Sequence, residues 1–199
     1  MAGLSASRAA GTVREVTAST FLVRRVTEEQ EWQVGLIWHD RLEAHMPAGG
    51  HAEIGEGVHD AARREVAEET GLTALLIPGP MAPFPAAFPH LPVPAPWWIC
   101  EGAASPDGHT PVPHVHVDHV FLALARAAEH PLDHAPDHHL EWFARERLAR
   151  DPSVSQDSRL LALQLMEWLR DAPAAFGEDP ALLAAHFTRQ AALPLRQGS

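Results

Sequence analysis

The chain has 199 residues, of which 46% are hydrophobic, so it can bury one sizeable core but is too short for two full domains. Its formal net charge is −11 and it contains no Lys, which argues against nucleic acid as a main partner. The single Cys100 excludes an internal disulfide and is expected to be a buried structural thiol. No apolar segment suits a signal peptide or a membrane span, so we expect a cytoplasmic protein without a membrane partner.

The first half of the chain predicts strands followed by a helix. Thr17–Arg25 and Trp32–His39 are rich in β-branched and aromatic residues, and the polar residues between them predict a hairpin. Gly57–Thr70 predicts a helix, because Gly71 follows at the position that commonly ends a helix in the left-handed conformation. A short apolar strand is expected at Leu72–Ile77.

The second half predicts a long loop, three strands and a helix. Pro recurs from Pro78 to Pro96 too often for a helix or a central strand. The Phe and Pro side chains of this loop could form a wall for a ligand or pack on the core. Strands are expected at Trp97–Glu101, His114–Ala125 and Leu140–Ala144, and an amphipathic helix at Ser155–Arg170.

These elements predict one main domain with two extensions. We place the domain at residues 13–171, between a flexible N-terminus (1–12) and a C-terminal extension (172–199). The extension has room for one short helix near Pro180–Arg189. It could cap the core or pair two subunits in a homodimer.

Three acidic residues of the predicted helix share one face. Glu65, Glu68 and Glu69 fall within an arc of about 100°, and like charges at these spacings repel unless a cation lies among them. A solvated acidic face is the usual alternative. Glu69, however, falls within the apolar stripe of the helix, which is formed by Val58, Ala62 and Val66. The carboxylates are therefore expected to border the core.

The residues around these carboxylates complete a candidate site. Gly49 and Gly50 allow the backbone to approach a metal or a phosphate closely. Glu56 can favour the helix dipole or hold Arg64 by a charge-assisted hydrogen bond, and Arg64 can in turn orient a carboxylate. Oxygen ligands suit Mg²⁺ or Mn²⁺, which bind through a few carboxylates plus substrate phosphates. The segment thus predicts a metal site for a phosphate-containing substrate.

The same segment matches a family pattern. From Gly50 onward it fits G-x5-E-x7-R-E-U-x-E-E-x-G-U, where U is a bulky aliphatic residue. The matching residues are Gly50, Glu56, Arg64, Glu65, Val66, Glu68, Glu69, Gly71 and Leu72. Residues 50–72 therefore resemble the Nudix box of the Nudix hydrolase superfamily. The resemblance implies an α/β fold, namely an α/β/α sandwich around a central mixed β-sheet.

The resemblance also implies a reaction. It predicts a pyrophosphohydrolase that cleaves a nucleoside diphosphate linked to another group and requires Mg²⁺ or Mn²⁺. Glu65, Glu68 and Glu69 would bind the metal, with the Gly49 carbonyl as a further ligand, and Gly50 would approach the substrate.

The remaining box residues would support catalysis. Arg64 and Glu56 would hold the catalytic carboxylates in place. Glu68 or Glu69 would serve as the base, and Glu141 is an alternative because some family members use a Glu on a distant loop. An exposed carboxylate at a strand end is the other interpretation of Glu141.

A second class of function remains open. Some Nudix-like domains have lost catalysis and act as nucleotide sensors, but these usually lack one or more box Glu residues. The substrate class stays open, since the sequence fits no subfamily pattern cleanly; for example, the Tyr typical of dinucleoside polyphosphate hydrolases is missing from a chain that has no Tyr.

A cluster of His residues lies outside the box. His114, His116 and Asp118 alternate onto one face of a predicted strand, followed on that face by apolar residues. Two His at this spacing with a carboxylate can bind zinc. Alternatively, this end of the strand meets solvent or points into the mouth of the active site, where His116 and Asp118 would contact substrate.

Overall fold

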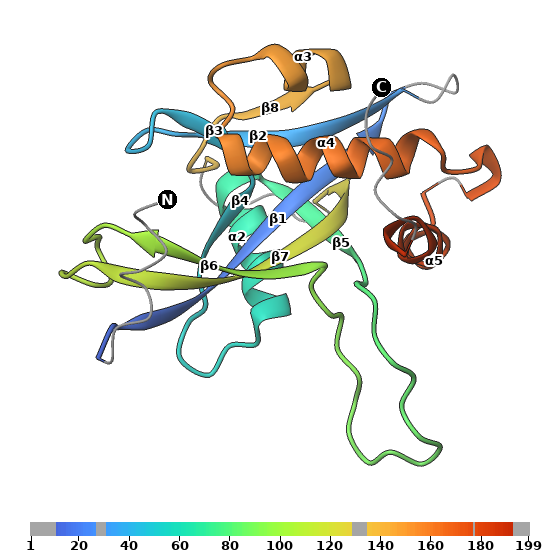
Figure 1. Cartoon of the computed structure of the whole chain (residues 1–199), viewed down its shortest axis with the longest axis horizontal. Coiled ribbons are helices and arrows are strands. Elements are labelled where there is room, and N and C mark those ends of the chain that lie inside the picture. Colours follow the sequence, from blue (N-terminus) through green and yellow to red (C-terminus); the bar gives the residue numbers. More distant parts are fainter. Residues whose placement is uncertain (1–10, 27–30, 129–134, 177, 193–199) are drawn as a thin grey trace.

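The computed structural model describes residues 11–26, 31–128, 135–176 and 178–192, so most of the expected flexible N-terminus (1–12) lies outside the described residues. Within the described residues the chain forms one mixed β-sheet with helices on both faces (Figure 1). The strands are β1 (Arg14–Arg25), β2 (Trp32–His39), β3 (Ala44–Met46), β4 (Ala48–His51), β5 (Leu72–Ile77), β6 (Trp98–Ala104), β7 (His114–Ala127) and β8 (Leu140–Phe143). The helices are α2 (Val58–Thr70), α3 (Arg145–Arg150), α4 (Gln156–Arg170) and α5 (Pro180–Ala191), with a 3-10 turn, η1, at Ala174–Phe176.

Strand β1 is at the centre of the sheet. The strand order is β3-β2-β1-β7-β5, while β4, β6 and β8 pair with β1, β7 and β2. One edge of β1 pairs with two antiparallel strands. Thr17–Thr20 pair with β4, and Leu22–Arg25 pair with β2. Its other edge pairs with β7 in parallel. The expected hairpin is therefore present, but it uses only the C-terminal end of β1. The N-terminal end lies between β4 and β7.

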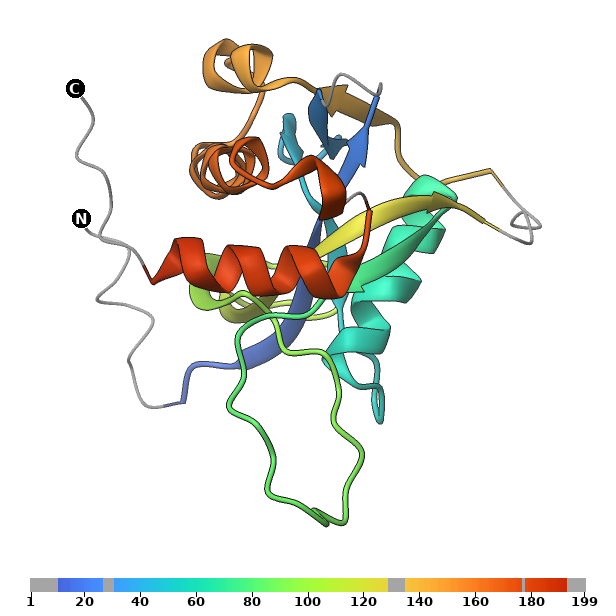
Figure 2. The same cartoon turned by 90° about the vertical axis from the view of Figure 1, so that its right-hand side faces the viewer.

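Alternate residues along the strands face two separate cores. On one face, Leu22 and Phe121 belong to a core that includes Val66 of α2. On the other face, neighbouring strand residues share a core with Trp168 of α4 and Phe187 of α5. The sheet thus lies between α2 and the α4–α5 pair (Figure 2). This arrangement confirms the predicted α/β/α sandwich with a central mixed sheet.

The C-terminal extension contains the short helix that the sequence indicates. Helix α5 begins after Asp179, whose carboxylate accepts hydrogen bonds from the backbone N–H groups of Ala181 and Leu182. Its residues Leu183 and Phe187 are fully buried. In the described residues the extension therefore caps the core, which is one of the two roles considered for it.

The Pro-rich loop (residues 78–96) extends away from the body of the protein (Figure 1). Phe84 and Phe88 do not pack on the core, because they stack on each other at 4.6 Å and both are exposed. No loop residue lines the cavity described below. Repeated Pro residues remove the N–H groups that a sheet needs, which explains why the loop leaves the sheet. The loop is closed at its base, where the Gly79 N–H donates to the Ala95 carbonyl at 2.9 Å.

The expectation of a buried thiol was wrong. Cys100 is exposed, because within the described part of the chain β6 pairs with β7 alone and most residues of β6 are open to solvent. The described helices include none that is both long and apolar enough to cross a membrane.

Candidate active site

The box helix α2 places one carboxylate inside the protein. Glu69 is only 8% exposed, and its Oε2 accepts a hydrogen bond from the Gly49 N–H at 2.8 Å. The pKa of the Glu69 carboxyl is raised to about 8, mainly by burial and also by the nearby Glu65, Asp137 and Glu68, while the hydrogen bond from Gly49 opposes the shift. The expected position of Glu69 beside the core is therefore confirmed.

Arg64 links the other acidic residues of the box. Its Nε and Nη2 donate to the two oxygens of Glu56 at 3.0 Å each, and Nη2 also donates to the His51 carbonyl at 2.9 Å. Its Nη1 donates to Glu65 at 2.8 Å and to Glu68 at 2.9 Å. The pKa of Glu56 is held below its usual range by Arg64, whereas burial raises that of Glu65. The guanidinium thus orients three carboxylates at once.

Two glycines bring strand β4 against the box. A Cβ atom on Gly50 would lie 2.5 Å from Oε1 of Glu65, so this position leaves the space that the carboxylate uses. A Cβ on Gly49 would lie 2.2 Å from the backbone oxygen of Ala18 in β1. One glycine is thus needed for the carboxylate and the other for strand pairing.

The loop before β8 docks on the C-terminal end of α2. The N–H groups of Asp137 and His138 donate to the carbonyls of Glu68 and Glu69 at 3.1 and 3.2 Å. The His138 Nε2 also lies 3.4 Å from Oε1 of Glu69. His138 was not among the expected site residues, because nothing in the spacing of DHAPDHH indicates that this loop reaches the helix.

Glu141 lies in a different environment from the box carboxylates. Its Oε2 accepts a hydrogen bond from Arg147 at 2.6 Å, and its Oε1 lies 3.3 Å from the His45 ring. Arg147 holds the pKa of Glu141 below its usual range. The structure therefore places Glu141 in an ion pair between β8 and α3, and Glu141 is not among the cavity-lining residues.

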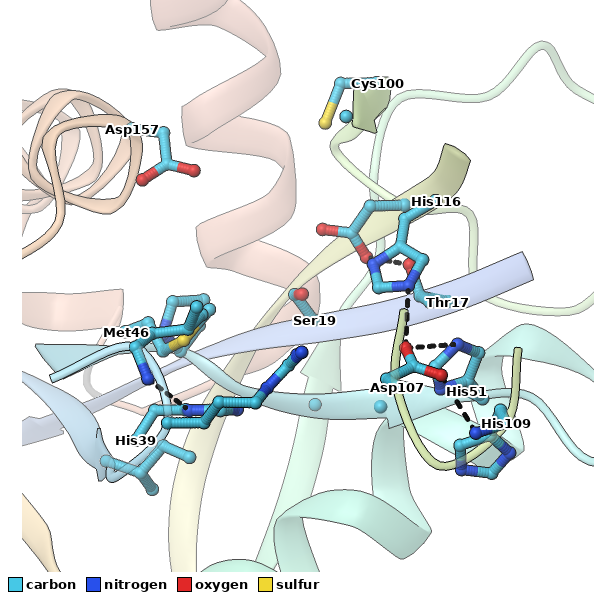
Figure 3. Close-up of a pocket in the computed structure, with 18 of the residues that line it drawn as sticks. Thr17, Ser19, His39, Met46, His51, Cys100, Asp107, His109, His116 and Asp157 are labelled. Atoms are coloured by element: carbon cyan, nitrogen blue, oxygen red, sulfur yellow. Dashed lines mark hydrogen bonds and ion pairs between the residues drawn. The ribbon is translucent and has the colours of Figure 1, made fainter. Parts of the chain in front are cut away.

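A cavity of about 510 Å³ opens beside β4. Gly49, Gly50, His116 and Asp118 line it, so the structure brings four of the expected site residues to one cavity. In Figure 3, His116, Asp107, His51 and His109 lie together at one side, and His39 and Met46 lie at the opposite side. The box carboxylates are not among the residues that line it, but Gly49 and Gly50 are, and these two glycines adjoin Glu69 and Glu65. Asp118 is held by the Thr17 hydroxyl, which donates to it at 3.0 Å.

The chain matches the family model for the NUDIX domain over residues 7–164. It belongs to the NUDIX family. The fold agrees with solved structures, including a hydrolase of the NUDIX family from Clostridium perfringens with 22% sequence identity and a TM-score of 0.59. That match covers 79% of this chain and 99% of the other. No curated protein matches the chain.

A second similar structure comes from Jonesia denitrificans and is described as a possible asymmetric diadenosine tetraphosphate hydrolase. It shares 22% identity with this chain at a TM-score of 0.52, and the match covers 81% of this chain and 98% of that one. At these identities the neighbours establish the fold alone. The family match confirms the expected enzyme class, a Nudix-type hydrolase, and the site residues remain predictions.

Proposed function

We propose that this NUDIX protein hydrolyses a phosphoanhydride bond in a small nucleoside diphosphate derivative with Mg²⁺ or Mn²⁺. The observation that carries the proposal is the convergence of Glu65, Glu68 and Glu69 at the end of one helix, next to a cavity reached past two glycines. Every box residue expected of an active family member is present. A silent sensor has no specific observation in its favour.

The chemistry of the site fits a hard divalent ion. The donors are all oxygens, which suits Mg²⁺ or Mn²⁺. The raised pKa of Glu69 reflects a buried carboxylate with like charges around it, and a cation would remove this penalty. Glu65, Glu68 and Glu69 would hold the ion. The bound ion would neutralise diphosphate oxygens and activate the attacking water.

The backbone of β4 supports Gly49 as a further ligand. In an antiparallel ladder, the N–H and the carbonyl of one residue point to the same side of the strand. The Gly49 N–H points to Glu69, away from its partner Ser19 in β1. The carbonyl of Gly49 is therefore directed toward the box.

Arg64 influences how the box carboxylates are divided between the guanidinium and a metal. In this structure its Nη1 lies between Glu65 and Glu68 and balances both charges. The Glu68 side chain is 42% exposed, so it can turn from Arg64 toward a metal, while the grip of Arg64 on Glu56 keeps the guanidinium in place. Arg64 and Glu56 would thus position the ligands.

The cavity would bind the rest of the substrate. Ile37, Leu42 and Met46 provide an apolar surface, while His116 and Asp118 provide polar groups on the opposite strand. An apolar wall with a few polar groups is the usual composition of a small-molecule site. We propose that a base or similar group lies here and that its diphosphate extends along Gly49 and Gly50 toward α2.

The test is product release from a panel of nucleoside triphosphates, dinucleoside polyphosphates, ADP-ribose, NADH and nucleotide sugars. The dinucleoside polyphosphates belong in the panel because the similar structure from Jonesia denitrificans is described as a possible hydrolase of diadenosine tetraphosphate. Wild type is compared with Glu69→Gln, each with Mg²⁺, with Mn²⁺ and with a chelator. We expect turnover of one substrate class that falls by at least about 100-fold in the variant.

Two results would contradict the proposal. Equal rates for wild type and Glu69→Gln would mean that the activity is a contaminant or that the ligand assignment is wrong. No turnover of any substrate, together with tight binding of one nucleotide, would instead establish a sensor.

A further inference from the structure

Four potential metal ligands come together apart from the box carboxylates. Glu15, His51, His114 and His116 each place one ligand atom within 4.8 Å of all the others. None of these residues has a role in the hydrolysis proposed above, apart from the expected contact of His116 with substrate. The group lies at the side of the cavity where Figure 3 shows His51 and His116 facing Asp107.

The sheet explains why these residues meet. In the parallel pairing of β1 with β7, Glu15 lies opposite His116. In the antiparallel pairing of β1 with β4, Thr17 lies opposite His51. Residues two apart on a strand share a face, so Glu15 and Thr17, His114 and His116, and His51 all project from the same side.

Two of the four side chains, Glu15 and His114, are held by partners away from the group. The Thr110 hydroxyl donates to Oε1 of Glu15, which leaves Oε2 facing the His rings. The Nδ1 of His114 lies 2.9 Å from the Val112 carbonyl. Because a carbonyl only accepts, Nδ1 carries the hydrogen, and Nε2 is the ring nitrogen that is directed at the group. Such backing of a His by a carbonyl is common behind metal ligands.

Three of the separations between ligand atoms are close to those around one small ion. The His114 and His116 Nε2 atoms are 3.0 Å apart, His51 Nε2 is 2.7 Å from Glu15 Oε2, and that oxygen is 3.7 Å from His114 Nε2. Ligands at about 2.0–2.1 Å from a tetrahedral zinc ion are separated by roughly 3.3 Å. Glu15 Oε2 and His51 Nε2 are also buried without a hydrogen bond of acceptable geometry among the described residues. A metal between them would satisfy both atoms.

We propose that Glu15, His51, His114 and His116 form a zinc site that is separate from the box carboxylates. Imidazole nitrogens with one carboxylate favour zinc over Mg²⁺, which prefers oxygen ligands. Asp107 lies 3.3 Å from His114 Nε2, so two carboxylates, Glu15 and Asp107, balance the charge of a divalent ion. The sequence pattern pointed to Asp118 as the carboxylate of a zinc site, but Thr17 holds Asp118. Glu15 takes that place.

The site would fix one wall of the cavity. Asp107 accepts hydrogen bonds from the N–H groups of His109 and Thr110, which links the β6–β7 loop to the His cluster. The carbonyl of His51 accepts a hydrogen bond from Arg64 of the box. Zinc would therefore connect the β6–β7 loop, β4 and, through the His51 carbonyl, Arg64 of the box. This inference does not depend on the proposed hydrolysis.

The experiment measures zinc binding to the full chain. After removal of metals with a chelator, the number of zinc ions bound and their affinity are determined by elemental analysis and by competition with a chromophoric chelator. We expect one zinc per chain with the affinity unchanged by excess Mg²⁺. His116→Gln and His51→Gln should weaken binding by about tenfold or more. Cobalt should give the intense visible absorption of a tetrahedral site in wild type and not in the two ligand variants.

Two variants serve as controls. His109→Gln alters a ring that stacks on His51 at 4.2 Å but is not in the group, and Glu69→Gln alters the box. Both should bind zinc like wild type. Thermal unfolding without zinc shows that each variant folds, and Glu15→Gln replaces any ligand variant that does not. Three results would overturn the proposal: ligand variants that bind zinc as tightly as wild type, a Glu69→Gln variant that no longer binds zinc, or wild type that binds no zinc at about 100 µM.

Discussion

The Arg64 guanidinium holds both oxygens of the Glu56 carboxylate, through Nε and Nη2 at 3.0 Å each. This bidentate pair lies just outside the group of carboxylates that we assign to the metal. It keeps the guanidinium flat against the box, so that the remaining nitrogens reach Glu65, Glu68 and the His51 carbonyl. The planar fork of Arg makes this arrangement possible, and an ammonium group of Lys cannot reproduce it.

We therefore expect Arg64→Lys to lower kcat/KM by roughly 10- to 100-fold, because displacement of the ligands by about 1 Å has effects of this size. Glu56→Gln should have a similar effect, because it removes the charge that holds Arg64. The double variant should lower kcat/KM by much less than the product of the two single reductions, since both changes break the same interaction. Steady-state kinetics of the four proteins measures the coupling, and independent effects would contradict the positioning role.

Gly49 and Gly50 give a matched pair of tests. Gly50→Ala places a methyl group against the end of the flexible Glu65 side chain, which can move away. We expect little change in thermal stability but a loss of activity of about 100-fold, because Glu65 is displaced. Gly49→Ala instead meets the backbone of β1 and should destabilise the fold by on the order of 2 kcal/mol. If both variants lose stability equally, the distinction between the two glycines is wrong.

Glu69 predicts how stability depends on pH in metal-free protein. Its pKa in the fold is about 8, above the ordinary value of 4.5, so the folded state keeps a proton that the unfolded chain releases. The stabilisation is complete below about pH 4.5 and is lost as the pH rises through 8. The free energy of unfolding of chelator-treated protein should therefore be lower at about pH 8.5 than at about pH 6, by on the order of a few kcal/mol, and the protein should unfold at a lower temperature at the higher pH.

Glu69→Gln should remove most of this pH dependence, because the amide does not titrate in this range. Mg²⁺ should also reduce it in wild type, since a metal can replace the proton as the partner of the carboxylate. Calorimetry over the pH range with both proteins tests the expectation. A slope that persists unchanged in Glu69→Gln would assign the proton to another group.

Glu68 and Glu141 can be compared as candidate bases. Glu141 is held by Arg147, and its lowered pKa makes it a poor proton acceptor at neutral pH. We expect Glu141→Gln to keep kcat within about threefold and Glu68→Gln to lower it by about 100-fold or more. Arg147→Gln is a control for the ion pair. A large loss of kcat in Glu141→Gln, with normal stability, would show that Glu141 takes part in catalysis.

The box could be predicted from sequence because its parts are local. Glu65, Glu68 and Glu69 lie on one helix, where their directions follow from residue spacing, and Gly71 ends that helix with a φ of 69° as expected. Strands β3 and β4 were not expected, since the sequence AHMPAGGH has little strand propensity. They form because β1 and β2 provide edges to pair with.

The His cluster shows the opposite case. His114 and His116 were found by their alternation, whereas Glu15 and His51 come from two other strands. Their proximity depends on the register of three paired strands, and no periodicity within one segment contains that information. The same reason explains Asp118, whose partner Thr17 lies on β1.

The hydrogen bond between Gly79 and Ala95 has a consequence for how this fold can vary. Because the two ends of the Pro-rich loop meet at its base, the pairing of the sheet does not depend on the number of residues between them. The entropic cost of closing the loop also changes only slowly with its length. Related chains can therefore lengthen, shorten or replace this loop without altering the register that places the box. A short Gly-containing turn grafted between these two residues should leave the enzyme intact.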